Sequence, residues 1–220
     1  QRYNDTVARR NTALKKAGAD SSWKSTLESL DELLVNLGSP LLYRRLGLVE
    51  ELSGYTQSTY KFIANGNCAV AYTSTLGETA LDLDEIKAAF RQRLRELGRE
   101  ELARGVTLAG PHRDDLSVSL NGKSFRYFGS QGQQRSVMLA LKMAEARCLQ
   151  RSFGTKPVLL LDDVFSELDS EKKSKVLSLC DFGFQVLMTS TELPKHTGPR
   201  FSLFRVENNA AMPWGVGNQS

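Results

Sequence analysis

Two stretches of the chain carry residue types that could act on a phosphate group. Residues 128–135 contain a glycine turn and lead into a segment with the apolar spacing of a helix. Residues 158–164 are an apolar run that ends in Asp162 and Asp163. A helix N-terminus offers backbone N–H groups to an anion, and acids after a parallel strand lie where open α/β sheets bind ligands. One Asp could hold Mg²⁺, and the next could orient a water for attack on a phosphoryl group.

A loop that cradles phosphates is missing from this pattern. Such a loop reads G-x-x-x-x-G-K-[ST], and Gly122-Lys-Ser124 resembles its end. Its first glycine would fall at Ser117, and Asn121-Gly122 is instead a signal for a hairpin turn. The sequence therefore predicts acids that could bind Mg²⁺, but it lacks the loop that would hold the phosphates.

Residues 110–115 form a second polar cluster, in which an arginine and two acids follow a Gly-Pro turn. Two interpretations stay open, a salt-bridged turn or a motif at the active face. A metal site built on histidine is not indicated, because the second histidine, His196, is remote in sequence. No G-x-S-x-G elbow supports a serine hydrolase. The residues of the cluster that could do chemistry are His112, Arg113, Asp114 and Asp115.

The composition of the chain limits the classes of protein to which it can belong. The chain has 220 residues, 40% of them hydrophobic and 25% charged, which is ordinary for a soluble globular protein. A net charge of +4 favours an acidic partner such as nucleic acid. Three widely spaced cysteines indicate reduced thiols in a cytoplasmic protein, and no apolar run reaches the ~18 residues that span a bilayer. Because the chain begins at Gln1 within an expected helix, we expect it to be a piece of a longer protein.

The first part of the chain, residues 1–104, is expected to form a helical arm. The patterns predict helices that are broken near Gly18 and again at Gly38-Ser-Pro40, and one strand. The last helix carries many arginines, which suit either a solvated face with i,i+4 pairs or a stripe that contacts phosphates. The candidate DNA contacts on it are Arg91, Arg95 and Arg99. The expected elements are helices over 1–16, 23–37, 41–61 and 85–102, and a strand over 68–74.

The second part, residues 105–207, is expected to form a domain of strands and helices, and residues 208–220 a frayed tail. The predicted fold class is α/β, with a partly parallel, partly antiparallel sheet flanked by helices and joined to the arm. The expected strands are 106–108, 116–120, 124–128, 158–161, 184–189 and 200–206, and the expected helices are 136–150 and 170–179.

Three motifs in combination resemble the RecF family of bacterial recombination mediators, relatives of the SMC-type and ABC-type ATPases. They are residues 110–115, residues 129–135, and residues 159–164 followed by Ser166-Glu-Leu-Asp169. The specific match spans about residues 105–192, and the preceding helices are compatible with the arm of the family. The Walker A loop of the family lies in an N-terminal part that is missing here. The resemblance therefore implies an arm plus the C-terminal half of an ABC-type head.

The resemblance also implies roles for particular residues. Asp162 matches the Walker B Asp that serves Mg²⁺, and Asp163 stands in place of the catalytic acid, usually Glu. The shorter Asp side chain suits a slow switch more than a fast motor. Residues 189–191 fall where ABC transporters place a histidine that senses the γ-phosphate, and no histidine is there. The residues implied to face ATP are those of the signature motif, Ser130, Gln131, Gly132, Gln133 and Gln134, with Asp169 of the D-loop.

By resemblance, the whole protein would use ATP and Mg²⁺ to dimerise on DNA. The homodimer would clamp double-stranded or gapped DNA through phosphate contacts, and with RecR and RecO it would promote RecA loading. A cytoplasmic, nucleoid-associated location without membrane contact follows. Without Walker A, this chain alone is expected to be inactive as an ATPase. Two alternatives stay open, another SMC-type or ABC-type DNA-structuring ATPase, and a non-catalytic fragment that binds a partner.

Overall fold

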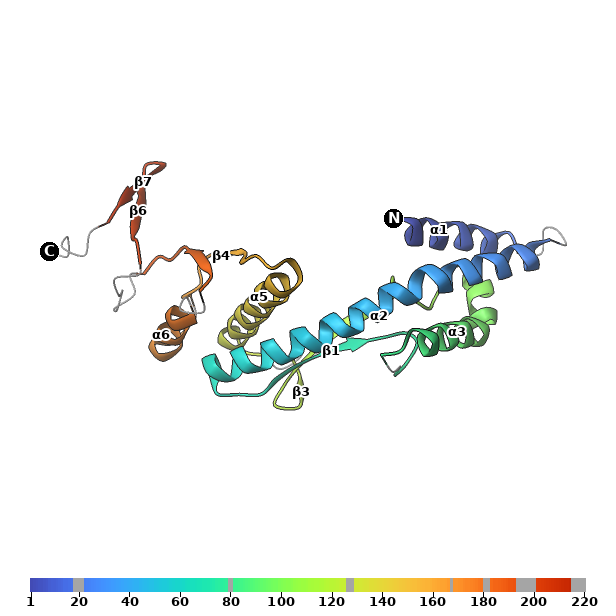
Figure 1. Cartoon of the computed structure of the whole chain (residues 1–220), viewed down its shortest axis with the longest axis horizontal. Helices are drawn as coiled ribbons and strands as arrows, with labels where there is room; N and C mark the ends of the chain where they lie inside the picture. The colour runs from blue at the N-terminus through green and yellow to red at the C-terminus, as the bar shows by residue number, and fades with distance from the viewer. Residues whose placement is uncertain are drawn as a thin grey trace. The chain divides into compact units, whose positions relative to one another are not determined.

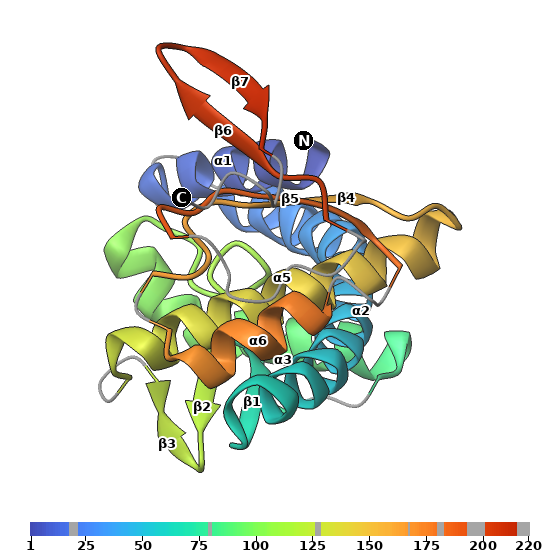
Figure 2. The ribbon, with the colours of Figure 1, turned by 90° about the vertical axis from the view of Figure 1, so that its left-hand side faces the viewer.

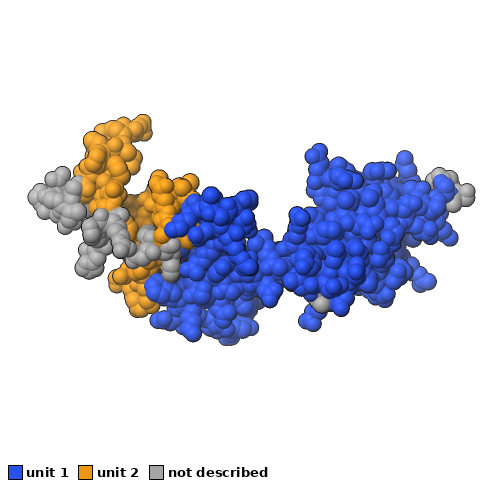
Figure 3. All heavy atoms as spheres, viewed as in Figure 1, with its two compact units in different colours: residues 1–157 blue, residues 158–220 orange. Residues whose placement is uncertain are grey.

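A computed structural model describes residues 1–17, 22–78, 81–125, 129–166, 168–179, 183–192 and 201–214. The chain divides into two compact units, residues 1–157 and residues 158–220, and each is described by itself (Figure 3). Packing therefore divides the chain at residue 157, whereas the functional boundary predicted at residue 104 stays a prediction. Over the described residues, no helix is long and apolar enough to cross a lipid bilayer.

The first unit is built along one helix, α2 (Trp23–Ala64), which runs unbroken for 42 residues (Figure 1). The break predicted at Gly38-Ser-Pro40 is wrong, because the helix continues through Pro40. A proline inside a helix costs about 3 kcal/mol through a lost hydrogen bond and a clash. Here the surrounding turns are anchored by packing, since the side chains of Val35 and Leu42 are almost completely buried.

The N-terminal half of α2 carries the first hydrophobic core. Helices α1 (Arg2–Lys15) and α3 (Leu83–Arg104) both pack against it. Asp82 caps α3 by accepting hydrogen bonds from the backbone N–H groups of Asp84 and Glu85 at 2.9 Å. The buried residues of this core are Tyr3, Leu34, Val35, Leu42, Ile86, Phe90, Leu94 and Ala109.

Gly38 is the point of closest approach in this core. A Cβ atom at Gly38 would lie 2.7 Å from Phe90 Cε1 and 2.9 Å from Tyr3 Cε2. The missing side chain therefore lets α1 and α3 approach the same turn of α2. Gly38 is part of the predicted break, and here tertiary packing outweighs its low helix propensity.

The C-terminal half of α2 carries a second core with α5 (Gln131–Phe153) and a small antiparallel sheet. Strands β1 (Cys68–Thr73), β2 (Asp115–Leu120) and β3 (Lys123–Ser124) lie in that order. Asn121 and Gly122 have φ of 49° and 79°, which confirms the predicted hairpin turn. Its return strand, predicted over 124–128, is β3 and ends at Ser124, because Phe125 is no longer in a strand, and residues 126–128 lie outside the described ranges.

The predicted strand at residues 106–108 is wrong, and the reason lies in side-chain hydrogen bonds. The N–H of Thr107 donates to Asn11 Oδ1 at 2.7 Å, and the N–H of Leu108 donates to Glu101 Oε1 at 2.7 Å. The carbonyl of Thr107 accepts from Arg113 Nε at 3.1 Å. The backbone groups that a sheet ladder would use are thus satisfied by side chains.

The second unit contains a strand–helix–strand segment, β4 (Val158–Leu161), α6 (Ser170–Leu179) and β5 (Gln185–Met188). The two strands pair in parallel, with Leu161 opposite Met188. Parallel β4–β5 and antiparallel β1–β3 together confirm the predicted α/β class with mixed strand directions.

The tail departs from the prediction that it frays from residue 208. Strand β6 (Phe204–Glu207) pairs with β7 (Ala210–Pro213) as a hairpin (Figure 2). Asn208 and Asn209 form its two-residue turn with φ of 49° and 62°, values that asparagine tolerates better than most residues. The frayed region is therefore wrongly assigned for residues 208–213, while residues 215–220 lie outside the described ranges.

We predict opposite effects for alanine at two glycines of α2. Gly38→Ala should lower the free energy of unfolding by about 1–3 kcal/mol, because the added methyl group meets Phe90 and Tyr3. Gly47→Ala in the same helix meets no atom within 4 Å and should raise it by about 0.5–1 kcal/mol. Urea unfolding of the chain measures both. A tolerated Gly38→Ala would contradict the packing described for this core.

Candidate nucleotide site

The two acids after β4 meet one hydroxyl group at the end of β5. Thr189 Oγ1 donates to Asp162 Oδ1 at 2.5 Å, and the N–H of Asp163 donates to Thr189 Oγ1 at 2.9 Å. The N–H of Thr189 also donates to the carbonyl of Leu161 at 3.0 Å, which extends the strand pairing by one step. The acids therefore stand at the carboxyl ends of paired parallel strands, where α/β sheets bind ligands.

The backbone turns sharply at the second acid. Asp163 has φ of 45°, a left-handed conformation that few non-glycine residues adopt and that Asp tolerates. The N–H of Ser166 donates to the carbonyl of Asp163 at 3.3 Å and closes the turn. The hydrogen bond from the Asp163 N–H to Thr189 thus fixes the backbone at the residue expected to act as the catalytic acid.

Asp169, the residue expected in the D-loop, contacts the first turn of α6. Its carboxylate accepts from the backbone N–H of Lys172 at 2.8 Å and forms an ion pair with Lys172 Nζ at 2.6 Å. The hydrogen bonds and charge of Lys172 lower the pKa of Asp169. Asp169 therefore acts as the cap of α6 in this structure. Glu167 lies outside the described residues.

The signature-like residues form the start of α5. Ser130 is its N-cap, and a capping box joins it to Gln133: the N–H of Gln133 donates to Ser130 Oγ at 3.3 Å, and the N–H of Ser130 donates to Gln133 Oε1 at 3.0 Å. Gln134 Nε2 donates to the carbonyl of Gly129 at 3.1 Å. Helix geometry leaves the N–H groups of Gln131 and Gly132 without intrahelical partners, as an anion-binding N-terminus requires.

Gly129 is in close contact with Phe125. A Cβ atom at Gly129 would lie 2.5 Å from Phe125 Cε2 and 2.8 Å from its Cδ2. A side chain at this position would therefore require the Phe125 ring to shift.

The structure brings some predicted residues together and leaves others in separate units. Asp162, Asp163 and Thr189 are neighbours in the second unit, whereas residues 130–134 belong to the first. Thr189 lies in the segment where the sequence comparison with ABC transporters predicts a phosphate sensor. Its contact with the two acids depends on the register of β4 and β5, which the sequence alone does not give.

The donors at β4 suit a hard cation held partly by substrate. No group of three or more His, Cys, Asp or Glu side chains that could hold a metal occurs among the described residues. Mg²⁺ commonly takes one or two carboxylates together with waters and substrate phosphates, and an exposed Asp162 meets that requirement.

The 110–115 cluster is a hydrogen-bonded turn of the first unit. Asp114 accepts from Tyr72 Oη at 2.8 Å, from the N–H of Thr75 at 2.7 Å and from Thr75 Oγ1 at 2.8 Å. Arg45 donates to the carbonyl of Pro111 at 2.5 Å. Burial and the hydrogen bond to Asp114 help raise the pKa of Tyr72 to about 12, although Arg45 opposes this rise. These contacts show a turn held by hydrogen bonds, and no ion pair of residues 110–115 occurs among the described residues. The role of the turn at an active face stays a prediction.

His112 ties the same turn to α1, and Arg113 ties it to the segment that precedes the turn. The hydroxyl of Tyr3 lies 2.9 Å from His112 Nδ1, and Arg113 Nε donates to the carbonyl of Thr107. Burial lowers the pKa of His112, which favours the neutral ring. Asp115 is exposed at the start of β2.

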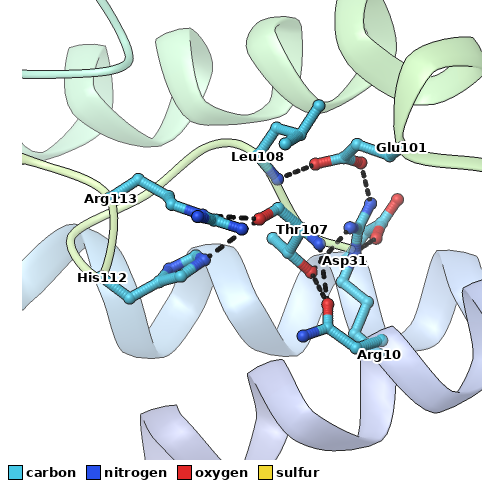
Figure 4. A network of polar contacts seen from close by, with 8 residues as sticks. Arg10, Asp31, Glu101, Thr107, Leu108, His112 and Arg113 are labelled. Carbon is cyan, nitrogen blue, oxygen red and sulfur yellow. Dashed lines mark hydrogen bonds and ion pairs between the residues drawn. The ribbon is translucent and has the colours of Figure 1, made fainter. Parts of the chain in front are cut away.

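A buried network of ion pairs and hydrogen bonds lies next to this turn (Figure 4). Arg10 is 1% exposed and donates to Asp31 at 2.6 Å, to Thr107 Oγ1 at 3.0 Å and to Glu101 at 2.7 Å. Burial lowers the pKa of Arg10, but its bonds to both acids outweigh this and raise it. Burial raises the pKa of Asp31 against the opposing effect of Arg10. The network joins α1, α2 and α3 to the segment that leads into the turn.

The candidate DNA-binding arginines differ in their surroundings. Arg91 forms a bidentate ion pair with Glu32 at 2.8 and 2.9 Å, and Arg95 donates to Gln92 at 3.2 Å. Arg99 is exposed and forms no ion pair within the described part of the chain. Arg99 is therefore the most accessible of the three for a phosphate.

Comparison with known proteins identifies consistent relatives, although no family model matches the chain. It is 37% identical over 216 residues to the DNA replication and repair protein RecF of Halothermothrix orenii, covering 94% of this chain and 58% of that protein. It is 34% identical over 215 residues to RecF of Bacillus subtilis, with the same coverage of 94% and 58%. The chain thus spans little more than half the length of the curated relatives it matches.

Solved structures give the same result for the fold. The structure of the recombination mediator protein RecF with ATP in the RecFOR pathway matches with a TM-score of 0.78 and 31% identity over 97% of this chain and 57% of that one. A second RecF structure, with the ligand named ATPrS, matches with a TM-score of 0.77 and 28% identity, over the same shares of the two chains.

We predict that the buried network is essential for stability. Glu101→Gln should lower the free energy of unfolding by about 3–5 kcal/mol, because it removes one partner of a buried ion pair. Glu32→Gln breaks the exposed pair with Arg91 and should have a far smaller effect. Urea unfolding compares the two. Equal losses of unfolding free energy in the two variants would show that the buried Arg10 network adds no more stability than an exposed ion pair.

Proposed function

We propose that this chain, which belongs to the RecF family by sequence and by fold, supplies the Mg²⁺ and signature side of an ATP site in a DNA repair protein. The observation that carries the proposal is the pair of acids at the end of β4, held by Thr189 from β5. The solved relative contains ATP, and this chain matches it over 97% of its own length.

In this proposal each acid has its own task. Asp162 would hold Mg²⁺, which neutralises charge on the β- and γ-phosphates. Asp163 would accept a hydrogen bond from the attacking water and orient it. Its side chain is one methylene shorter than that of Glu, so we expect slow hydrolysis suited to a switch.

The start of α5 would face the γ-phosphate of ATP held by a second copy. The N–H groups of Gln131 and Gly132 and the Ser130 hydroxyl are suitable donors for an anion. Ser130 Oγ accepts from the N–H of Gln133 in the capping box, and its own hydroxyl proton remains free to rotate toward a phosphate. ATP would in this way join two subunits, and hydrolysis would release them.

DNA would be the macromolecular substrate. A net charge of +4 and the exposed Arg99 suit contacts to phosphates that do not depend on sequence. We include RecR and RecO as partners and RecA loading as the outcome, on the strength of family membership. The tight turn at 110–115 would support the arm and carry no chemistry of its own.

A second candidate function is that of a binding fragment. Alternate residues of the β4–β5 pair are strongly exposed, with Leu160 at 73% and Leu187 at 52%. Such a face favours association with another protein segment. Self-association that rises with concentration in the absence of ATP would favour this function over the nucleotide site.

We predict that Mg-ATP binds only when the site is completed. Calorimetric titration of this chain alone should show no binding, and binding should appear after the remaining segment of a RecF protein is added. Asp162→Asn should abolish the Mg²⁺-dependent part of ATP binding, because it removes the carboxylate charge that would bind the metal. Glu171→Gln, which removes an exposed acid paired with Lys175 on α6, should leave binding unchanged. Tight binding by the chain alone would overturn the assignment.

We predict that DNA binding weakens steeply between about 50 and 200 mM salt, by about tenfold or more, because bound phosphates release counterions. Arg99→Ala should reduce the slope of log Kd against log salt by about 1, whereas Arg91→Ala should change it less because Glu32 already pairs with Arg91. Fluorescence anisotropy with a gapped duplex measures both. A flat salt response would exclude the phosphate-contact model.

A further inference from the structure

Thr189 forms hydrogen bonds with both acids, and the roles proposed for Asp162 and Asp163 do not by themselves explain these bonds. Its hydroxyl has one proton, which is donated to Asp162 Oδ1, and the oxygen accepts the N–H of Asp163. The two bonds run in one direction, from the backbone of one acid through the hydroxyl to the carboxylate of the other.

The strand register explains why Thr189 reaches both acids. Leu161 pairs with Met188 in the parallel ladder, so the next residues on the two strands, Asp162 and Thr189, lie side by side. The bond from the Thr189 N–H to the carbonyl of Leu161 holds the threonine at that position. The strand backbone thus places Thr189 beside Asp162, and its short side chain carries the hydroxyl to both acids.

One oxygen of Asp162 is committed by this contact and the other is not. Within the described residues, Asp162 Oδ2 forms no hydrogen bond, and the residue is exposed. A hydrogen bond to one oxygen of a carboxylate fixes its rotation and directs the second oxygen outward. Groups that orient a metal ligand in this manner typically affect metal affinity by about 10–100-fold.

We infer that Thr189 is a positioning residue that fixes the Asp162 carboxylate for Mg²⁺ and the Asp163 backbone for its left-handed turn. This inference rests on the proposed function of Asp162. Thr189 is not required to contact the nucleotide. The role differs from that of a phosphate sensor, because the threonine acts through the acids. A sensor would contribute to ATP affinity even when Mg²⁺ is absent.

The test measures ATP affinity by calorimetry, first in EDTA and then at rising Mg²⁺ concentration, with this chain combined with the remaining segment of a RecF protein. Thr189→Val keeps the shape and removes the hydroxyl, whereas Thr189→Ser retains it. We expect Thr189→Val to raise the Mg²⁺ concentration at half-saturation by about 10-fold or more without changing the affinity in EDTA. Thr189→Ser should stay within about threefold of the unmodified chain, and Thr189→Ala should behave like the valine variant.

Controls separate this role from a structural one. Ser178→Ala removes an exposed hydroxyl of α6 in the same unit, one that donates to Ser174, and should leave the Mg²⁺ dependence unchanged. Because Thr189 is exposed, water can replace its hydrogen bonds, so its variants should unfold near the midpoint of the unmodified chain.

The outcomes distinguish this inference from the proposed function. If the unmodified chain, combined with the remaining segment, binds Mg-ATP and Thr189→Val shows the same Mg²⁺ dependence, the positioning role is wrong and the proposed function stands. If Thr189→Val weakens ATP binding equally in EDTA, Thr189 acts on the nucleotide, and the inference is again wrong. If the unmodified protein shows no Mg²⁺-dependent ATP binding, the proposed function fails, and the inference fails with it.

Discussion

The buried guanidinium of Arg10 is the contact on which the first unit depends. A charge that is 1% exposed needs partners to offset its loss of water, and here each of the three guanidinium nitrogens donates a hydrogen bond, to α2, to α3 and to residue 107. Glu101 is completely buried and satisfies both Arg10 and the backbone N–H of Leu108. The segment at 107–108 is therefore fixed in position before it enters the 110–115 turn.

Helix α2 extends this constraint along the unit. Leu34 and Leu42 belong to the first core and Tyr60 belongs to the second, so one helix is anchored at both ends. Pro40 could have been a joint, but the contact of Gly38 with Tyr3 and Phe90 surrounds it with packed side chains. Helix α5 packs on the same α2, which places the signature-like residues on the body that also carries the arm.

The sequence predicts the elements that depend on local signals. Asn121-Gly122 identifies the hairpin, and the apolar runs identify β4 and β5. The unbroken α2 and the irregular segment at 106–108 could not be foreseen, because each depends on partners remote in sequence, such as Arg10 with Glu101, 91 residues apart. The acids Asp162 and Asp163 were predictable by type, whereas their link through Thr189 follows from strand register.

The link through Thr189 has a chemical consequence if the proposed function is correct. The same hydroxyl orients the carboxylate that would hold Mg²⁺ and anchors the backbone of the acid that would orient the water. A change that moves this hydroxyl then alters both contacts at once, because the same oxygen donates its proton to Asp162 and accepts the N–H of Asp163. Metal binding and water orientation would thus be coupled within the second unit.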